Sequence, residues 1–225
     1  MSVRDDGHQI VELAEAQYGV VSRRQLLDIG LTRSMIETRL RRGSLVALHP
    51  GVYAVGHRQL RREGHWLAAV LALGPGAALS HRDAAALHGL LPSSRSRIDV
   101  ATTRRARSGR GITVHQTVVL EAQDLTVVDV IPVTTVARTL IDLAYVVPRE
   151  RVAKALREAE HLRVVDVGEL REAMRRVRTR KGRGHAVLDA VLLEQRRRGT
   201  QLTRSGSWRT ASSRSAKPTA SRYRT

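Results

Sequence analysis

The first residues of the chain place apolar side chains at helical spacing. Ile10, Leu13 and Ala14 recur at this spacing within residues 8–17, and Gly19 follows where a C-terminal cap would stand. This pattern predicts a first amphipathic helix.

Two further helices are predicted from their capping residues. Ser22 and Gln25 have the spacing of a capping box, in which each side chain accepts from or reaches back to the other's backbone amide. Gly30 ends this second helix, and Thr32 can cap a third one after a turn of about three residues. A helix, a short glycine-containing turn and a second helix form a helix-turn-helix arrangement.

A β-hairpin is predicted after the third helix. Two short apolar runs flank His49-Pro50-Gly51-Val52, and proline followed by glycine fits the centre of a type II turn. Helices followed by a hairpin predict a winged helix-turn-helix DNA-binding domain over residues 1–57.

The middle of the chain mixes helical and strand-like patterns, which predicts an α+β second domain over residues 58–197. The apolar stretch at 64–74 and the stretch at 80–91, where Ser80 and Asp83 have capping-box-like spacing, predict helices. The strand-like runs are 97–103, 111–117 and 125–134, and the later predicted helices are 134–144, 149–162, 167–177 and 185–197. Residues 198–225 lack apolar periodicity and predict a disordered basic tail.

The third predicted helix has the composition of a DNA-reading helix. At helical spacing Ile36 and Leu40 share one face, while hydroxyl and guanidinium groups occupy the opposite face and its borders. We expect Ser34, Thr38 and Arg41 to approach bases, and the remaining candidates to contact phosphate. The predicted DNA-binding residues are Arg33, Ser34, Thr38, Arg39, Arg41, Arg42, His49 and Arg58, with His57 beside them. The alternatives are a basic helix that only faces water, with Glu37 pairing to Arg41, and a winged helix that contacts protein.

The charge of the chain favours nucleic acid, with a reservation. The net charge is +18, from 39 basic and 21 acidic residues. From Arg196 onwards there are nine basic residues and no acidic one, so half of the net charge lies in the last thirty residues. The chain has no cysteine, which excludes disulfides and thiolate metal sites. No apolar stretch reaches the length of a membrane span, so we expect a cytoplasmic protein without a membrane partner.

The sequence does not indicate catalysis, a cofactor or a metal. No acid-x-lysine step of a metal-dependent nuclease occurs, and the carboxylates Asp99, Asp124, Asp129 and Asp142 are interpreted as caps or surface groups. His81, His88 and His115 together with Asp83 could in principle bind metal, but such residues are more often packed polar groups. We therefore expect a protein that is not an enzyme.

The block "VVSRRQLLDIGLTRSMIETRLRRGSLVALHPGVYAVGH" resembles the N-terminal domain of AbiEi-type antitoxins of type IV toxin–antitoxin systems. The later segments "HWLAAVLALGPGAALSHRDAAALHGL", "GITVHQT" and "IPVTTVARTLIDLA" are similar to the middle region of an actinobacterial group that carries this domain. The resemblance implies a transcriptional regulator that binds double-stranded DNA and represses its own operon. It also implies a nucleotidyltransferase-like toxin as a functional partner, without a tight complex.

The end of the chain departs from that group, whose members often continue into a restriction-endonuclease-like domain. Here "TQLTRS" is followed by "GSWRTASSRSAKPTASRYRT", and a one-base shift of a permitted back-translation restores the expected type of continuation. We therefore expect a frameshift near Ser205 that removed the nuclease domain; the alternative is a native basic arm with nonspecific phosphate affinity. Two other functions stay open: an inactive remnant of an endonuclease related to very-short-patch-repair nucleases, and a protein-interaction module.

Overall fold

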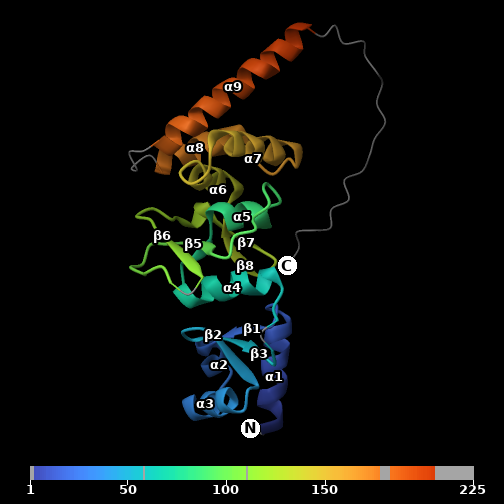
Figure 1. Cartoon of the computed structure of the whole chain (residues 1–225), viewed down its shortest axis with the longest axis vertical. Helices are drawn as coiled ribbons and strands as arrows, with labels where there is room; N and C mark the ends of the chain where they lie inside the picture. The colour runs from blue at the N-terminus through green and yellow to red at the C-terminus, as the bar shows by residue number, and fades with distance from the viewer. Residues whose placement is uncertain (1–2, 58, 110, 178–182, 206–225) are drawn as a thin grey trace, which may run out of the picture.

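The computed structural model describes residues 3–57, 59–109, 111–177 and 183–205. The predicted C-terminal tail lies outside these residues from 206 onwards, and so does the proposed frameshift product. The chain forms an elongated molecule with the N-terminal unit at one end and the last helices at the other (Figure 1).

The N-terminal unit packs three helices against a small antiparallel sheet of order β1-β3-β2. Its elements are α1 (Val3–Glu15), β1 (Val20–Ser22), α2 (Arg23–Asp28), α3 (Arg33–Arg41), β2 (Leu45–His49) and β3 (Val52–Val55). The predicted helices and hairpin are therefore present, and a short strand, β1, is added to them. Helix-turn-helix plus hairpin is the arrangement of a winged helix.

The second unit is built around a five-stranded mixed sheet of order β6-β5-β4-β8-β7. Its strands are β4 (Ala78–Leu79), β5 (Ile98–Thr102), β6 (Ile112–Gln116), β7 (Leu125–Val128) and β8 (Ile131–Thr134). Strands β5 and β6 are parallel, as are β4 and β8, whereas β4 with β5 and β7 with β8 are antiparallel. The overall class is α+β, as predicted.

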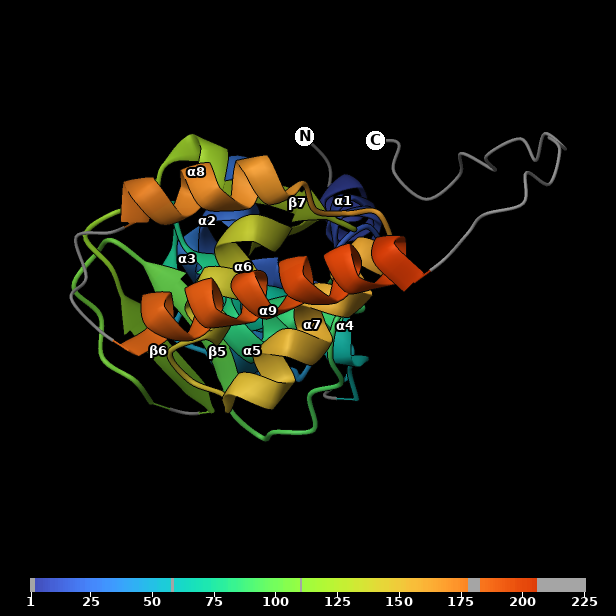
Figure 2. The ribbon, with the colours of Figure 1, turned by 90° about the horizontal axis from the view of Figure 1, so that it is seen from above.

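Helices cover both sides of this sheet. They are α4 (Arg62–Leu73), α5 (His81–Leu87), α6 (Val136–Leu143), α7 (Arg149–His161), α8 (Val167–Val177) and α9 (Arg183–Ser205), with a short 3₁₀ helix, η1 (Ala122–Asp124). Figure 1 shows α4 between the sheet and the N-terminal unit, and α5 and α6 on the other side, below α7, α8 and α9. Figure 2, seen from above, shows α9 lying across this helical layer. Helix α9 continues eight residues beyond the helix end predicted at 197.

Aliphatic residues fill three main cores. One lies between α6, α7, α8 and α9 and includes Leu140, Leu156 and Leu188, all fully buried. A second joins the sheet to α4, and a third fills the N-terminal unit. A smaller cluster, in which Val52 of the hairpin meets Ala68 of α4, connects the two units.

Two features of the sheet differ from the expectation. Residues 125–134 form a hairpin and not a single run, because Asp129 and Val130 adopt positive φ angles of 45° and 62° and reverse the chain. Such angles are favoured by Gly, Asn and Asp, so Val130 gives no turn signal in the sequence. Strand β4 has two residues and was not predicted. It pairs with β5 on one side and with β8 on the other.

Candidate nucleic-acid interface

Side chains cap the N-terminal ends of α2 and α3 by accepting hydrogen bonds from backbone amides. Ser22 Oγ accepts from the Gln25 amide at 3.2 Å, and Gln25 Oε1 accepts from the Ser22 amide at 2.9 Å, which confirms the predicted capping box. Thr32 Oγ1 accepts from the Met35 amide at 3.3 Å. The turn between the two helices includes Gly30, whose φ of 96° favours glycine.

One side of α3 is packed into the N-terminal core. Ile36 is fully buried, and Leu40 and Met35 pack against the same cluster, which includes Leu26 of α2 and Leu45 of β2. This packing leaves the opposite side of α3 free to face outwards. Helix α3 therefore has the orientation that the sequence predicted.

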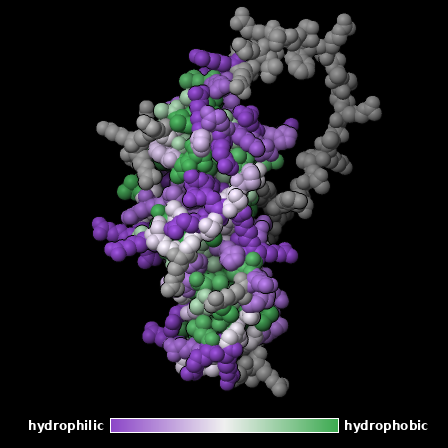
Figure 3. Space-filling view, in the orientation of Figure 1, coloured by the Kyte–Doolittle hydropathy of each residue, from purple (hydrophilic) through white to green (hydrophobic). Residues whose placement is uncertain are grey.

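The outward side carries the predicted hydroxyl and guanidinium groups. Arg33, Ser34, Arg41 and Arg42 are exposed, whereas Thr38 and Arg39 are half-buried. Figure 1 places α3 at the end of the molecule away from the second sheet, and Figure 3 shows hydrophilic side chains around this end. The structure thus brings six of the eight predicted DNA-binding residues onto one helix and its C-terminal cap.

Arg41 is held in place by a neighbour on its own helix. Its Nη2 atom donates to Thr38 Oγ1 at 3.1 Å, and no ion pair joins Arg41 to Glu37 in the described part of the chain. Ser34 Oγ and Thr32 Oγ1 are 3.0 Å apart at the start of the helix. The guanidinium of Arg41 keeps further N–H donors for an external acceptor.

The charge at the start of α3 is unfavourable for the isolated protein. The first turn contains Arg33 and no acidic residue, although the N-terminal end of a helix carries partial positive charge. Helices α2, α6 and α9 also have no acidic residue in the first turn, whereas α4, α7 and α8 have Glu63, Glu150 and Glu169 there. A bound anion at the start of α3 would compensate this arrangement.

The hairpin residues are placed differently from those of α3. The hairpin rests on the second unit, where Leu48 and Val52 pack with Ala68 and Leu71 of α4. His49 is half-buried and lines a cavity of about 370 Å³ that includes Arg62, His65, Trp66 and Asp83. His57 is exposed after β3, and Arg58 lies outside the described residues. The hairpin is therefore fixed relative to the second sheet.

Several carboxylates that were interpreted as caps or surface groups are buried, so the surface interpretation is wrong for them, although Asp124 does cap η1 by accepting from the Glu121 amide at 3.2 Å. Asp99 and Asp124 are fully buried and Asp142 is nearly so, whereas Asp129 is exposed in its turn. Asp124 and Asp142 both pair with the buried Arg138, at 3.1 Å each. Burial is compatible with charge here because each carboxylate has a cationic partner.

Ser80 and Asp83 do not form the suggested capping box, because both side chains are used elsewhere. Ser80 Oγ lies 2.9 Å from His81 Nδ1, and Ser80 makes no capping hydrogen bond. Asp83 Oδ1 accepts from Trp66 Nε1 at 3.0 Å, and Asp83 Oδ2 accepts from the Asp99 amide at 2.8 Å. Asp83 thus connects α5 to α4 and β5.

The histidines considered for metal binding have separate contacts. His81 stacks on His115 with ring centroids 3.6 Å apart, and His115 Nε2 lies 2.9 Å from Asp99 Oδ1. His88 instead has its Nε2 atom 2.8 Å from the Thr134 carbonyl oxygen. Within the part of the chain that the structure describes, no group of three or more His, Cys, Asp or Glu could hold a metal ion.

The two buried aspartates of this cluster have opposite pKa shifts. Burial raises the pKa of Asp83 above its usual value, against the hydrogen bonds from the Asp99 amide and Trp66. Burial also acts to raise the pKa of Asp99, but the hydrogen bond and charge of His115, together with Arg82, hold it below its usual value. Sequence reasoning grouped His81, His115 and Asp83 with His88, but it did not predict that Asp99 and Trp66 join them, since the members come from α4, α5, β5 and β6.

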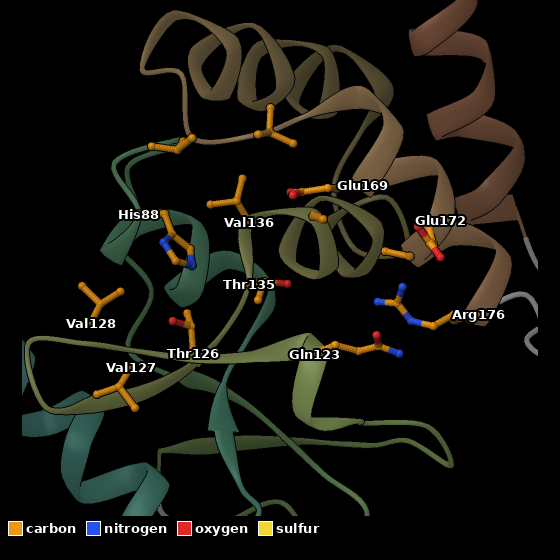
Figure 4. A pocket seen from close by; sticks show the side chains of 14 residues that line it. His88, Gln123, Thr126, Val127, Val128, Thr135, Val136, Glu169, Glu172 and Arg176 are labelled. Atoms are coloured by element: carbon orange, nitrogen blue, oxygen red, sulfur yellow. The ribbon is translucent and has the colours of Figure 1, made fainter. Parts of the chain in front are cut away.

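A cavity of about 650 Å³ lies between β7, α6 and α8. In Figure 4 the His88, Thr126 and Thr135 side chains lie along it, with Arg176 at the far end. Burial lowers the pKa of His88. No local pattern indicates this cavity, because its lining combines β7 and the start of α6 with α8 and with His88 at the end of α5.

Taken together, a capped helix-turn-helix with an outward basic helix and an adjoining hairpin defines the class of winged helix-turn-helix proteins. Residues 8–56 match the family described as transcriptional regulator, AbiEi antitoxin. The predicted resemblance is confirmed for this part of the chain.

The fold of most of the chain is similar to that of a solved structure. The crystal structure of the RV2827C protein from Mycobacterium tuberculosis aligns with a TM-score of 0.51 and 18% sequence identity, over 81% of this chain and 75% of that chain. This similarity supports the fold. No curated protein matches the chain. Among the described residues, no helix combines the length and the apolar character needed to cross a membrane.

Proposed function

We propose that the protein is a DNA-binding transcriptional regulator of the antitoxin type, and that α3 enters the major groove. The observation that carries this proposal is the outward face of α3, where Ser34, Thr38 and Arg41 stand between Arg33 and Arg42. Short polar and cationic side chains on such a face suit base edges and phosphates. The family match of residues 8–56 supports the same function.

The residues of the interface divide into two roles. Arg41, steadied by Thr38, would pair with a guanine through two N–H donors, a contact worth about 1–3 kcal/mol of discrimination. Arg33, Arg39 and Arg42 would contact phosphates on either side of the groove and so position the helix. His57 and Arg58 complete the proposed interface from the end of the hairpin, whereas His49 lines the cavity beside Arg62 and Trp66 and is left out of the interface.

We propose that the chain divides into two domains with different roles in DNA binding. Residues 1–57 would bind DNA, and residues 58–197 would hold the hairpin in place through the contact of Val52 with Ala68. As in type IV toxin–antitoxin systems, the regulated target would be the protein's own operon, with a nucleotidyltransferase-like toxin as functional partner. No catalytic step is assigned to the chain.

The test measures the binding of the full chain to a labelled duplex from its own upstream region and to a shuffled duplex. We expect tighter binding to the upstream duplex, and we expect Arg41→Ala to reduce this preference by about tenfold or more. Arg33→Ala and Arg42→Ala should weaken both duplexes equally and lower the salt slope by about 1 each. Arg171→Ala, an exposed arginine of α8, is the matched control.

Equal affinity of the unmodified protein for the two duplexes would refute sequence-specific regulation. If Arg171→Ala and Arg33→Ala weakened DNA binding equally, the proposal that α3 binds the DNA would be refuted. Repression of a reporter that carries the upstream region, lost in Arg41→Ala, tests the regulatory part of the proposal separately.

A further inference from the structure

Strand β7 forms an edge of the five-stranded sheet, and its outer side pairs with no other described strand. Val127 is 62% exposed, and Val130 in the following turn is 48% exposed. An edge strand of this kind presents backbone N–H and C=O groups that can pair with another chain. Edge strands that are protected against pairing usually carry charged residues or proline, and not exposed valines.

The β7 edge is flanked by a cavity on each side of the sheet. The α8 cavity, about 650 Å³, is the one shown in Figure 4 and is bounded by α6, α8 and β7. The α4 cavity, about 570 Å³, is bounded by α2, the end of α4 and β7. Thr126 and Val127 line both cavities, so the edge of the sheet lies between them.

The side chains of β7 point alternately to the two faces of the sheet, although Thr126 and Val127 both border both cavities. Figure 4 shows Thr126 on the side of the α8 cavity, and Val127 pointing away from it. Leu125 and Pro132 line the α4 cavity but not the α8 cavity, which fits the same alternation. An added strand has the same period of two, so its successive side chains would enter the two cavities in turn.

The two cavities differ in chemistry. The α8 cavity contains the exposed carboxylates Glu169 and Glu172, while its one arginine, Arg176, is bound to Asp124 at 3.0 Å. The α4 cavity is mainly apolar in its wall, which includes Val70, Leu71, Pro75, Ala77, Leu125, Val127 and Pro132. A strand that fills both would therefore alternate basic and apolar residues.

We propose that the β7 edge binds an extended segment of a partner protein in which basic residues alternate with apolar ones. The segment adds a sixth strand to the sheet, with main-chain hydrogen bonds to β7 providing affinity. Its basic side chains face Glu169 and Glu172, and its apolar side chains enter the α4 cavity. This surface is separate from α3, so it does not depend on the proposed DNA binding.

The test titrates the full chain into a fluorescein-labelled peptide of about eight residues that alternates arginine and valine. We expect saturable binding by fluorescence anisotropy, together with slower hydrogen exchange of the amides of residues 125–128. The same peptide with glutamate in place of arginine, and one with N-methyl groups on the backbone of one edge, should bind at least about tenfold more weakly.

Variants locate the site on the protein. Val127→Lys should weaken binding of the peptide by about tenfold, because it places a charge at the apolar cavity that the valines of the peptide enter. The double variant Glu169→Gln/Glu172→Gln should weaken it similarly and increase the ratio of glutamate-peptide to arginine-peptide affinity. The matched controls are Val118→Lys, at a side chain that is 87% exposed elsewhere, and Glu12→Gln/Glu15→Gln on α1.

Unchanged exchange at residues 125–128 with saturating peptide would overturn the proposal, as would equal effects of Val127→Lys and Val118→Lys. Absence of saturable binding would overturn it too. Sedimentation provides a further check: a dimer that Val127→Lys dissociates would show that a second copy of this chain occupies the edge in place of a partner peptide.

Discussion

Arg138 and Asp124 form an ion pair at 3.1 Å in which the arginine side chain is 2% exposed and the aspartate side chain is fully buried. The same guanidinium binds Asp142 one helical turn further along α6, and donates to the Val119 carbonyl oxygen at 2.8 Å. From the other side, Arg176 of α8 binds Asp124. One buried arginine thus joins α6 to the segment before β7, beside the α8 cavity.

We predict that Arg138→Met destabilises the protein by about 3–5 kcal/mol, because it leaves Asp124 and Asp142 buried without their main cationic partner. The measurement is urea denaturation followed by circular dichroism. The triple variant Arg138→Met/Asp124→Asn/Asp142→Asn should recover part of this loss, since no carboxylate then stays uncompensated. A loss below about 1 kcal/mol for Arg138→Met would contradict the burial of this pair.

Arg33→Glu is predicted to move stability and DNA binding in opposite directions. The substitution places negative charge at the positive end of α3 and should raise the free energy of unfolding by about 0.3–1 kcal/mol at low salt. It should also abolish binding to duplex DNA, since the glutamate repels phosphate. Thermal denaturation and anisotropy of the same sample check both parts. If both properties fell together, the loss of binding would reflect damage to the fold.

Thr32→Ala and Ser34→Ala separate helix capping from DNA contact. Thr32 caps α3, so Thr32→Ala should lower stability by about 1 kcal/mol. Ser34 is exposed and its hydroxyl lies 3.0 Å from Thr32 Oγ1, so Ser34→Ala should change stability by less than about 0.5 kcal/mol while weakening the preferred duplex. Urea denaturation and DNA titration distinguish the two; an equal loss of stability would show that Ser34 is structural.

His88 makes stability depend on pH. Because burial lowers its pKa in the folded state, the unfolded chain binds a proton first as the pH falls through 6.5. The contribution of His88 to stability is therefore largest above this value and decreases towards pH 5. His88→Gln keeps a donor for the Thr134 carbonyl oxygen and should make the stability curve flatter between about pH 7 and 5. An unchanged slope would contradict the assigned shift.

Asp83 should have the opposite effect on the pH dependence of stability, in a lower pH range. Its raised pKa means that the folded state binds a proton before the unfolded state as the pH falls towards 3.8, which supports folding on acidification. Asp83→Asn should thus make the decline of stability steeper just above pH 3.8, beyond the constant loss from its disturbed hydrogen bonds. Denaturation midpoints at a series of pH values test this; a shallower decline would reverse the sign of the shift.

Local signals sufficed for most of the N-terminal unit. Ser22, Gln25 and Thr32 satisfy backbone amides within three residues along the chain, so their role is visible in the sequence. Pro50-Gly51 likewise reverses the chain by its own backbone preferences. The outward face of α3 could be predicted for a related reason, since the period of the helix determines which residues share a side with Ile36.

By itself, the sequence determined most of the helices, the caps of α2 and α3, the first hairpin and the basic face of α3, because each depends on residues that are neighbours along the chain. Only the tertiary structure decided that Asp99, Asp124 and Asp142 are buried, that the hairpin rests on α4, and that β7 is an edge between two cavities. Those features depend on which distant segments meet, and the cost of burying a charge is offset only by a partner from another element.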